Sequence, residues 1–449
     1  MNMVFFLSLF GLLGVVYLIL GTFASRNIKT TTDYFLAGRD LGFLPVTFTL
    51  VATQLGGGLL LGTSAEAYNV GYYGILYTLS MSLGFILLGL GFASKLQSLN
   101  VSTTAELFET RYGSPLLKKL ASLLSILTLC GILIAQIVAA RKLILGLGIG
   151  SETILILFWI GVIVYTMVGG LKAVVITDTF QVGFILLIFT GIFLYAISGN
   201  PESFFSFSAI AKNQQLFSAA DVSFSGLIGV ALMPALFSLI EQDLAQRFFA
   251  ARTKRIAALS ALSASGFLVI FSLVPIYFGM QAKLTGLAVE GSPLMPFIGL
   301  VAGEFVMALA ACAIIAAITS TADSLLCAIS SNISQDFGGL FVGVKNKLKL
   351  SKIITLLTGI SAIVASYLVP QNIIGVLIGS YELSVCCLLV PLLFSYFRKN
   401  LRKGAAIGSI LLGLAGFVLF RFYPVPFPRE LATLALSLLG YAGGHFLSR

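Results

Sequence analysis

The chain has 449 residues, of which 58% are hydrophobic and only 10% are charged, and its formal net charge is +10. A soluble domain contains about 25% charged residues, so this composition excludes an ordinary soluble protein. With a mean hydropathy of +1.04 and recurrent apolar runs of roughly 20 residues, the sequence predicts an all-α polytopic membrane protein in a lipid bilayer.

About thirteen hydrophobic segments are long enough to be membrane helices. They lie near residues 3–23, 43–65, 71–93, 116–140, 152–170, 177–198, 222–243, 256–280, 297–331, 352–369, 372–397, 404–421 and 430–447. The first segment has the length of a signal peptide, but no Lys or Arg precedes it, as one does in a secretory signal. We therefore interpret it as a retained helix.

The 27 Lys and Arg residues indicate the orientation of the chain. When the loops are assigned alternately to two sides, most of these residues fall on the side of Lys95, Lys172 and Arg398. By the positive-inside rule this side is cytoplasmic. The N-terminus is then outside, and the C-terminus is in the cytoplasm, beneath a plasma (inner) membrane. The basic charge is thus a topology signal, and no nucleic-acid partner is expected.

The second segment contains "ATQLGGGLLLG" (52–62), with three adjacent glycines inside an apolar run. Each glycine lowers helix stability by about 1 kcal/mol relative to alanine. If the helix unwinds here, the carbonyl groups of Ala52 and Leu55 can face an interior cavity, where such oxygens bind a small alkali cation. A glycine-lined packing face is the alternative, and these residues alone do not separate the two interpretations.

The stretch "GGLKAVVITDTFQ" (169–181) leads into the sixth segment. Gly169 and Gly170, with Lys172, indicate a short cytoplasmic turn. Asp178 follows about a turn and a half into the next apolar run. It is either a carboxylate that interacts with the dipole of a helix start or a cation ligand inside the bundle.

The seventh segment carries "GVALMPALFS" (229–238), in which Pro234 removes a backbone donor and predicts a second interrupted helix. The following "IEQDLAQRF" (240–248) is expected to end this segment at the cytoplasmic surface. Its charged side chains would be solvated or paired there.

The ninth segment contains "AAITSTADSLLCAISS" (316–331). Spacing of i, i+3, i+4 and i+7 puts four residues on one helix face: Ala317, Ser320, Thr321 and Ser324. Asp323 lies close to the same face, although an Asp at mid-membrane costs about 2.5–3.5 kcal/mol. A bound cation would offset that cost, so this face is a candidate ion site.

The segments group into two sets of five, which we assign to residues 40–198 and 222–397. Because five is odd, the two sets would have opposite orientations. One extra N-terminal helix (1–23) and two C-terminal helices (402–449) would flank them. Inverted repeats with interrupted helices and a site at the membrane midplane are typical of secondary transporters.

Over essentially its whole length the chain resembles the sodium:solute symporter family, which has a LeuT-like core. The matching stretches are "DYFLAGRDLGFLP" (33–45), "ATQLGGGLLLGTSAEAY" (52–68), "GGLKAVVITDTFQ" (169–181), "QDLAQRFFAARTKRIA" (242–257) and "AAITSTADSLLCAISS" (316–331). The resemblance implies symport of an organic solute driven by the Na⁺ gradient, by alternating access.

The resemblance also implies the ion ligands. The main sodium site would use backbone oxygens of Ala52, Leu55 and Ala317 together with the hydroxyls of Ser320 and Thr321. A second sodium site, as in some family members, would use Asp178, Ser320, Asp323 and Ser324. Proton coupling stays open, because both aspartates titrate.

For the solute, the motif pattern looks most like that of the choline-transporter branch. The resemblance implies that this branch binds the quaternary ammonium group of its solute in an aromatic cage built with tryptophans. The only tryptophan here is Trp159, outside the motifs, and Gln54 and Glu241 stand where the pattern would have Trp. An amide at position 54 suits a polar or zwitterionic solute, with proline or another amino acid favoured. A partial cage from Tyr72, Tyr73 and Tyr77 keeps choline- or betaine-like solutes open.

The residues expected to contact the solute are Gln54, Gly57, Tyr77, Gln136 and Met233. No enzyme activity is expected, because no His/Cys/Ser constellation is present. A channel would need rings of polar residues along a continuous path, and a sensor would usually carry a signalling domain. No obligatory protein partner is evident from the sequence.

Overall fold

The computed structural model describes residues 3–26, 28–148, 152–198, 224–288, 292–338, 346–369, 372–423 and 427–447. Within these ranges all elements are helical, apart from an isolated bridge between Leu41 and Ala251. Ten of the described helices are long and apolar enough to cross a membrane. The prediction of an all-α polytopic fold is confirmed, whereas the count of thirteen membrane helices stays a prediction.

The elements before residue 200 are α1 (Met3–Ser25), α2 (Thr31–Leu36), η1 (Ala37–Arg39), α3 (Phe43–Gln54), η2 (Gly58–Gly62), α4 (Thr63–Val70), η3 (Gly71–Gly74), α5 (Ile75–Leu87), η4 (Leu88–Phe92), α6 (Ala93–Ser98), α7 (Glu106–Tyr112), α8 (Pro115–Gly146) and α9 (Glu152–Ile197). The later elements are α12 (Phe224–Ser238), α13 (Gln242–Ala250), α14 (Lys254–Leu284), α15 (Leu294–Asp336), α16 (Lys347–Ala365), α17 (Ile373–Phe397), α18 (Lys403–Phe422) and α19 (Arg429–Leu447). The assignment of 40–198 and 222–397 to two repeats stays a prediction, and its boundary at 222 lies outside the described residues.

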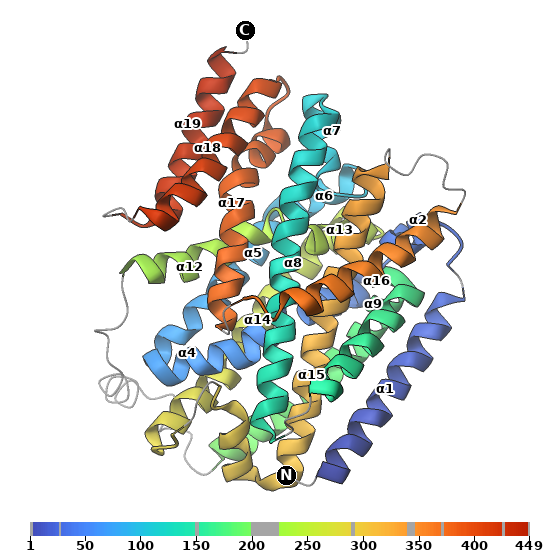
Figure 1. The fold of residues 1–449 in the computed structure, drawn as a ribbon, viewed down its shortest axis with the longest axis vertical. Helices are drawn as coiled ribbons and strands as arrows, with labels where there is room; N and C mark the ends of the chain where they lie inside the picture. Colours follow the sequence, from blue (N-terminus) through green and yellow to red (C-terminus); the bar gives the residue numbers. More distant parts are fainter. Residues whose placement is uncertain are drawn as a thin grey trace.

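The arrangement of the helices places the two chain ends at opposite ends of the molecule (Figure 1). Helix α1 lies along one edge against α9, and α18 and α19 form a hairpin at the other edge, against α17 (Figure 1). An odd number of membrane crossings requires ends on opposite sides. The sidedness itself, with the N-terminus outside, stays a prediction.

The first interrupted helix is confirmed. Helix α3 ends at Gln54, and Leu55 and Gly56 are not helical. The chain then resumes as the π-helical turn η2 before α4. A Cβ atom added at Gly56 would lie 2.5 Å from Thr321 Oγ1, so the close approach of α15 to this break requires glycine.

The second interruption occurs later than predicted. Pro234 lies inside α12, and the break falls at residues 239–241, between α12 and α13. The helix tolerates Pro234 because a proline removes only one backbone donor. The hydroxyl of Ser238 donates to the Pro234 carbonyl at 2.8 Å, and the amide of Ala235 donates to Ser80 Oγ at 3.0 Å.

The expected turn at Gly169–Gly170 is a sharp bend within α9, where Gly170 has φ +51° and ψ −159°. This positive φ is unfavourable for a residue with a side chain. A Cβ atom there would also lie 2.5 Å from the Tyr34 carbonyl oxygen. The bend directs the second half of α9, which carries Asp178, towards α3.

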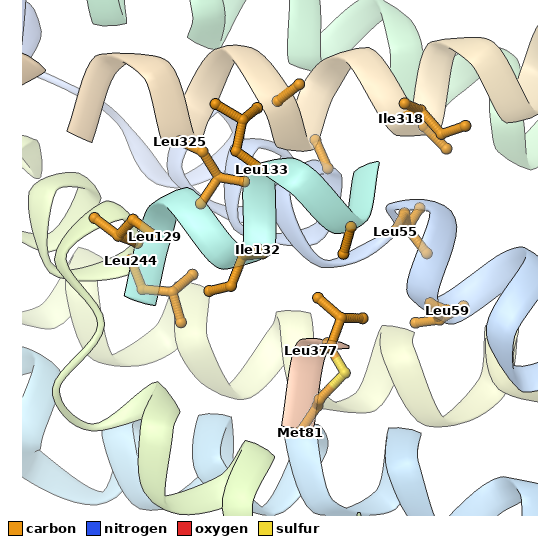
Figure 2. Close-up of a cluster of buried hydrophobic side chains, with 14 of the residues drawn as sticks. Leu55, Leu59, Met81, Leu129, Ile132, Leu133, Leu244, Ile318, Leu325 and Leu377 are labelled. Atoms are coloured by element: carbon orange, nitrogen blue, oxygen red, sulfur yellow. The ribbon is translucent and has the colours of Figure 1, made fainter. Parts of the chain in front are cut away.

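Buried leucines and isoleucines from six elements pack around the two breaks (Figure 2). The labelled residues are Leu55 and Leu59 at the first break, Met81 on α5, Leu129, Ile132 and Leu133 on α8, Leu244 on α13, Ile318 and Leu325 on α15, and Leu377 on α17. Four of them, Leu59, Ile132, Leu325 and Leu377, also line the interior cavity described below, together with polar residues.

Candidate functional site

The first break meets the polar face of α15. Ser320 Oγ donates to the Ala52 carbonyl at 3.0 Å, and Thr321 Oγ1 donates to the Thr53 carbonyl at 2.9 Å. Both hydroxyls also lie within 3.2 Å of the Ala317 carbonyl. The structure therefore brings together four of the predicted ligands of the main sodium site. The fifth, Leu55, is buried at the first non-helical position of the break.

These groups are carbonyl and hydroxyl oxygens, which suit a hard alkali cation. They are almost completely buried, with Thr321 5% exposed and Ala52, Ala317 and Ser320 at 0%. Two hydroxyls that donate to carbonyl groups can turn their lone pairs to an ion that enters between them. The chemistry of this set fits Na⁺.

The residues predicted for the second sodium site lie in a buried network beside this set. Asp178 accepts a hydrogen bond from Thr49 Oγ1 and forms an ion pair with Arg247, with 3.6 Å between Oδ2 and Nη2. The other oxygen of Asp178, Oδ1, has no hydrogen-bond partner among the described residues. A guanidinium group therefore already neutralises this carboxylate in part.

Arg247 connects the two ends of the network. Its Nε donates to Thr49 Oγ1 at 2.9 Å, its Nη1 donates to the Asp243 carbonyl at 2.7 Å, and its Nη2 donates to Ser324 Oγ. Asp323 accepts a hydrogen bond from the hydroxyl of Tyr165. The weak contact between Thr53 Oγ1 and Ser324 Oγ, at 3.4 Å, links the network to the first break.

The expectation for "IEQDLAQRF" was wrong in part. Asp243 and Arg247 are 0% exposed, and Glu241 is 6% exposed, so these side chains are not solvated. Arg247 is paired, as the second half of the expectation allowed. Helix α13 packs against α3 and α15 in the interior instead of ending at the surface, and this tertiary packing accounts for the burial.

A cavity of about 20 Å³ lies beside the ion ligands. Its lining residues are Thr53, Gln54, Gly56, Gly58, Leu59, Tyr77, Ile132, Gln136, Glu241, Thr321, Leu325, Leu377 and Tyr381. This volume holds about one water molecule, so the walls must separate to admit an organic solute.

Three of the predicted solute contacts line this cavity: Gln54, Tyr77 and Gln136. Gly57 lies just outside its wall, where the Gly57 amide donates to Gln136 Oε1 at 2.9 Å. Met233 is fully buried in α12 and does not line the cavity.

Sequence reasoning missed Tyr381 as a member of this wall. Its hydroxyl lies 3.1 Å from the Tyr77 hydroxyl, and its ring stacks on Phe237 with 4.6 Å between centroids. Of the three tyrosines expected to form a partial cage, only Tyr77 lines the cavity, and Tyr73 is 44% exposed. The polar stretch "YELS" (381–384), inside an apolar segment, is the signal in the sequence that could have found Tyr381.

A larger cavity, of about 770 Å³, lies between α4, the end of α8 and the starts of α15 and α17. Its wall includes Glu66, Asn69, Lys142 and Asn372. By the predicted orientation it opens on the outer side, at the end of the first interrupted helix. We refer to it as the vestibule.

Several solved structures share this fold. A Na⁺-coupled sialic acid symporter in a substrate-bound outward-open state matches with a TM-score of 0.81 at 19% identity, covering 99% of this chain and 97% of that one. The nucleobase-cation-symport-1 family transporter Mhp1 has a TM-score of 0.61 at 12% identity, covering 92% and 94%. MhsT in complex with L-phenylalanine has a TM-score of 0.56 at 16% identity, covering 91% and 99%.

These neighbours confirm the predicted LeuT-like fold, and the first two are a symporter and a transporter, not enzymes. They do not identify a solute or a branch, so the choline-transporter likeness stays an expectation. The model of the sodium:solute symporter family matches residues 34–413. The match covers most of the chain, which therefore belongs to the sodium:solute symporter family.

Proposed function

We propose that the protein is a secondary active transporter that couples Na⁺ to the uptake of a small polar or zwitterionic organic solute. One observation carries this proposal: the carbonyl groups of the first break face the hydroxyls of α15. Ser320 Oγ lies 3.0 Å from the Ala52 carbonyl, and Thr321 Oγ1 lies 2.9 Å from the Thr53 carbonyl. In this assignment Na⁺ is bound by the backbone oxygens of Ala52, Leu55 and Ala317 and by these two hydroxyls.

Two residues support direct coupling between ion and solute. Thr53 and Thr321 are joined by the hydrogen bond at the proposed ion site, and both also line the cavity. An ion that fixes the broken helix against α15 therefore fixes part of the cavity wall. Na⁺ binds first and orders this wall, and the solute then closes the path from the vestibule. A membrane potential that is negative inside adds about 2.3 kcal/mol of driving free energy per transported positive charge for each 100 mV.

A second Na⁺ at Asp178, Ser320, Asp323 and Ser324 is a separate proposal. The Arg247 guanidinium already contacts Asp178 and Ser324. Since two cations repel one another at such a distance, Na⁺ would occupy this site only after Arg247 moves away. The protein would then carry one or two Na⁺ per cycle, depending on the position of one side chain.

Proline or another amino acid is the solute class we favour, because the amides of Gln54 and Gln136 line the cavity. Choline- or betaine-like solutes are the alternative, and proton coupling is the alternative for the ion. We place the protein in the plasma (inner) membrane with its N-terminus outside, and we expect no obligatory protein partner.

The test is a thermal-shift screen of the purified full chain with amino acids, sugars, betaines and carboxylates, each with and without Na⁺. We expect Na⁺ alone to stabilise the protein and one class of solute to add stability only when Na⁺ is present. Hits are then tested for uptake into proteoliposomes with Li⁺ or K⁺ in place of Na⁺ and at varied pH. Saturable uptake that needs a pH gradient but no Na⁺ would contradict the assignment of the ion.

A further inference from the structure

Glu241 is a carboxylate in the wall of the solute cavity. It lies at the second break, where it directly precedes α13 with extended backbone angles of φ −63° and ψ 127°. Its side chain lines the cavity together with Gln54, Tyr77 and Tyr381, and it is 6% exposed. In the sequence, position 241 stands out only because it lacks the tryptophan of the choline-transporter pattern.

No basic side chain is committed to Glu241. Among the described residues no salt bridge involves Glu241, and no Lys, Arg or His lines the cavity. Arg247, on the helix that Glu241 precedes, is near enough to attract Glu241, but its guanidinium is held by Asp178, Thr49, Ser324 and the Asp243 carbonyl. Glu241 hydrogen-bonds with Asp243 and Gln54, but no basic side chain among the described residues contacts its carboxyl group, so a cation that enters the cavity could pair with it.

The electrostatics of the surroundings favour a cation. A buried charge is costly unless it is paired and hydrogen-bonded, and the region around the two breaks holds Asp178, Asp243, Asp323 and Glu241 against one arginine. A Na⁺ at the proposed ion site is bound by neutral oxygens, next to Thr321 rather than at Glu241. A positively charged group on the solute would balance Glu241 directly.

The aromatic residues of the wall favour the same kind of group. Tyr77 and Tyr381 line the cavity beside Glu241, and Phe237 stacks behind Tyr381. Aromatic rings attract ammonium groups, most strongly where water is excluded. A carboxylate and two tyrosines around one small cavity are thus suited to a compact organic cation.

We propose that the transported solute carries a positively charged nitrogen, as an amino or quaternary ammonium group, and that this nitrogen pairs with Glu241 between Tyr77 and Tyr381. The inference rests on the proposed function and narrows its solute class. Amines, amino acids and betaines fit this wall, whereas sugars, uncharged nucleobases and solutes that carry only negative charge do not.

The experiment compares charged compounds with isosteres that lack the positive charge. The full chain is titrated in Na⁺ with choline, trimethylglycine and L-proline, and with their carbon analogues: a tert-butyl group in place of trimethylammonium, and cyclopentanecarboxylate for proline. We expect stabilisation by at least one compound with a charged nitrogen and none by its analogue. Equal binding of an analogue, or no binding of any positively charged member, would overturn the inference.

Variants test whether Glu241 is the residue that pairs with the charged nitrogen of the solute. We expect Glu241→Gln to weaken binding of the charged compound at least about 30-fold, and Glu241→Asp, which keeps the charge, to restore part of the affinity. Glu382→Gln is the matched control, because Glu382 is also a buried glutamate, on α17, but pairs with Arg429 outside the cavity. It should leave the affinity for the solute unchanged.

The stabilisation by Na⁺ alone separates this inference from the proposed function. If Na⁺ stabilises the protein and drives uptake of a neutral or anionic solute, or if Glu241→Gln binds the charged compound like the wild type, only the inference fails. If Na⁺ neither stabilises the protein nor supports any uptake, the proposed function fails as well.

Discussion

The two interrupted helices have different chemistry. The break after α3 consists of apolar residues and glycines, and it presents backbone carbonyl groups to the hydroxyls of Ser320 and Thr321. The break before α13 presents the carboxyl group of Glu241, and α13 itself carries the buried Asp243 and Arg247. One break thus supplies neutral oxygen ligands, and the other supplies fixed charge. A transporter that must bind both an ion and a solute can divide the two tasks between two breaks.

The largest expected effect concerns the close approach at the first break. Gly56→Ala places a methyl group 2.5 Å from Thr321 Oγ1 and 2.9 Å from Gln136 Oε1. We expect Na⁺-driven uptake to fall about 100-fold or more, because misplaced binding groups cost that much. Gly183→Ala on α9 is the control, since a Cβ atom there meets nothing within 4 Å. Normal uptake by Gly56→Ala would mean that the two elements need not touch.

In α13, which follows the second break, the largest effect is on stability. Arg247→Gln leaves the buried Asp178 without its ionic partner, which costs about 3–5 kcal/mol in comparable cases. We expect a strongly lowered unfolding midpoint, partly recovered in the double variant Arg247→Gln/Asp178→Asn, as measured by thermal unfolding in detergent.

The control for this pair is the exposed ion pair between Arg252 and Asp40, in which the side chains are 58% and 70% exposed. Arg252→Gln should leave the midpoint unchanged, since exposed pairs contribute little. Additive effects of Arg247→Gln and Asp178→Asn would show that the two side chains do not interact in the protein.

Loss of one proposed ion ligand is expected to have an intermediate effect. Thr321→Ala removes a hydroxyl at the first break, and we expect the Na⁺ concentration for half-maximal stabilisation to rise about 30-fold, the equivalent of a lost hydrogen bond to a charged group. Ser409→Ala removes a buried hydroxyl paired with Ser437 at 2.9 Å in the C-terminal hairpin and should not change it. An unaltered Na⁺ response in Thr321→Ala would remove this residue from the proposed ligands.

The smallest expected effect is on solute binding at the cavity wall, away from both breaks. Tyr77→Phe removes the hydroxyl that lies 3.1 Å from Tyr381 but keeps the ring. A neutral hydrogen bond contributes about 1 kcal/mol, so the solute affinity should fall less than 10-fold in a binding titration, with no change in the response to Na⁺. A shifted Na⁺ response would indicate that the tyrosine pair supports the ion site as well.

The same comparison explains how much was predictable from the sequence. The helical spacing of Ala317, Ser320 and Thr321 predicted their common face, and the glycines of the first break predicted its position, because both effects are local. Glu241 and Arg247 were misjudged since a charged stretch at the end of an apolar segment is usually solvated. Their burial depends on α13 packing against α3 and α15, which no local pattern indicates.

Two other expectations differ from the structure for a related reason. Pro234 was taken to mark the second break, but Ser80 on α5 and Ser238 hold the helix together around it. Met233, its neighbour, is then directed into the packed interior and not into the cavity. Tyr381 takes part in the wall instead, from a helix more than 300 residues from Tyr77 in the chain.

The hydrogen bond between Thr321 and the Thr53 carbonyl lies at the proposed ion site, and both residues also line the solute cavity. Thermodynamic reciprocity then requires that Na⁺ raise the affinity for solute by the same factor by which solute raises the affinity for Na⁺. On each side of the membrane the solute affinity would therefore follow the local Na⁺ concentration, and a cell whose Na⁺ gradient collapses would bind solute equally well on both sides. The same carrier would then let accumulated solute leak out.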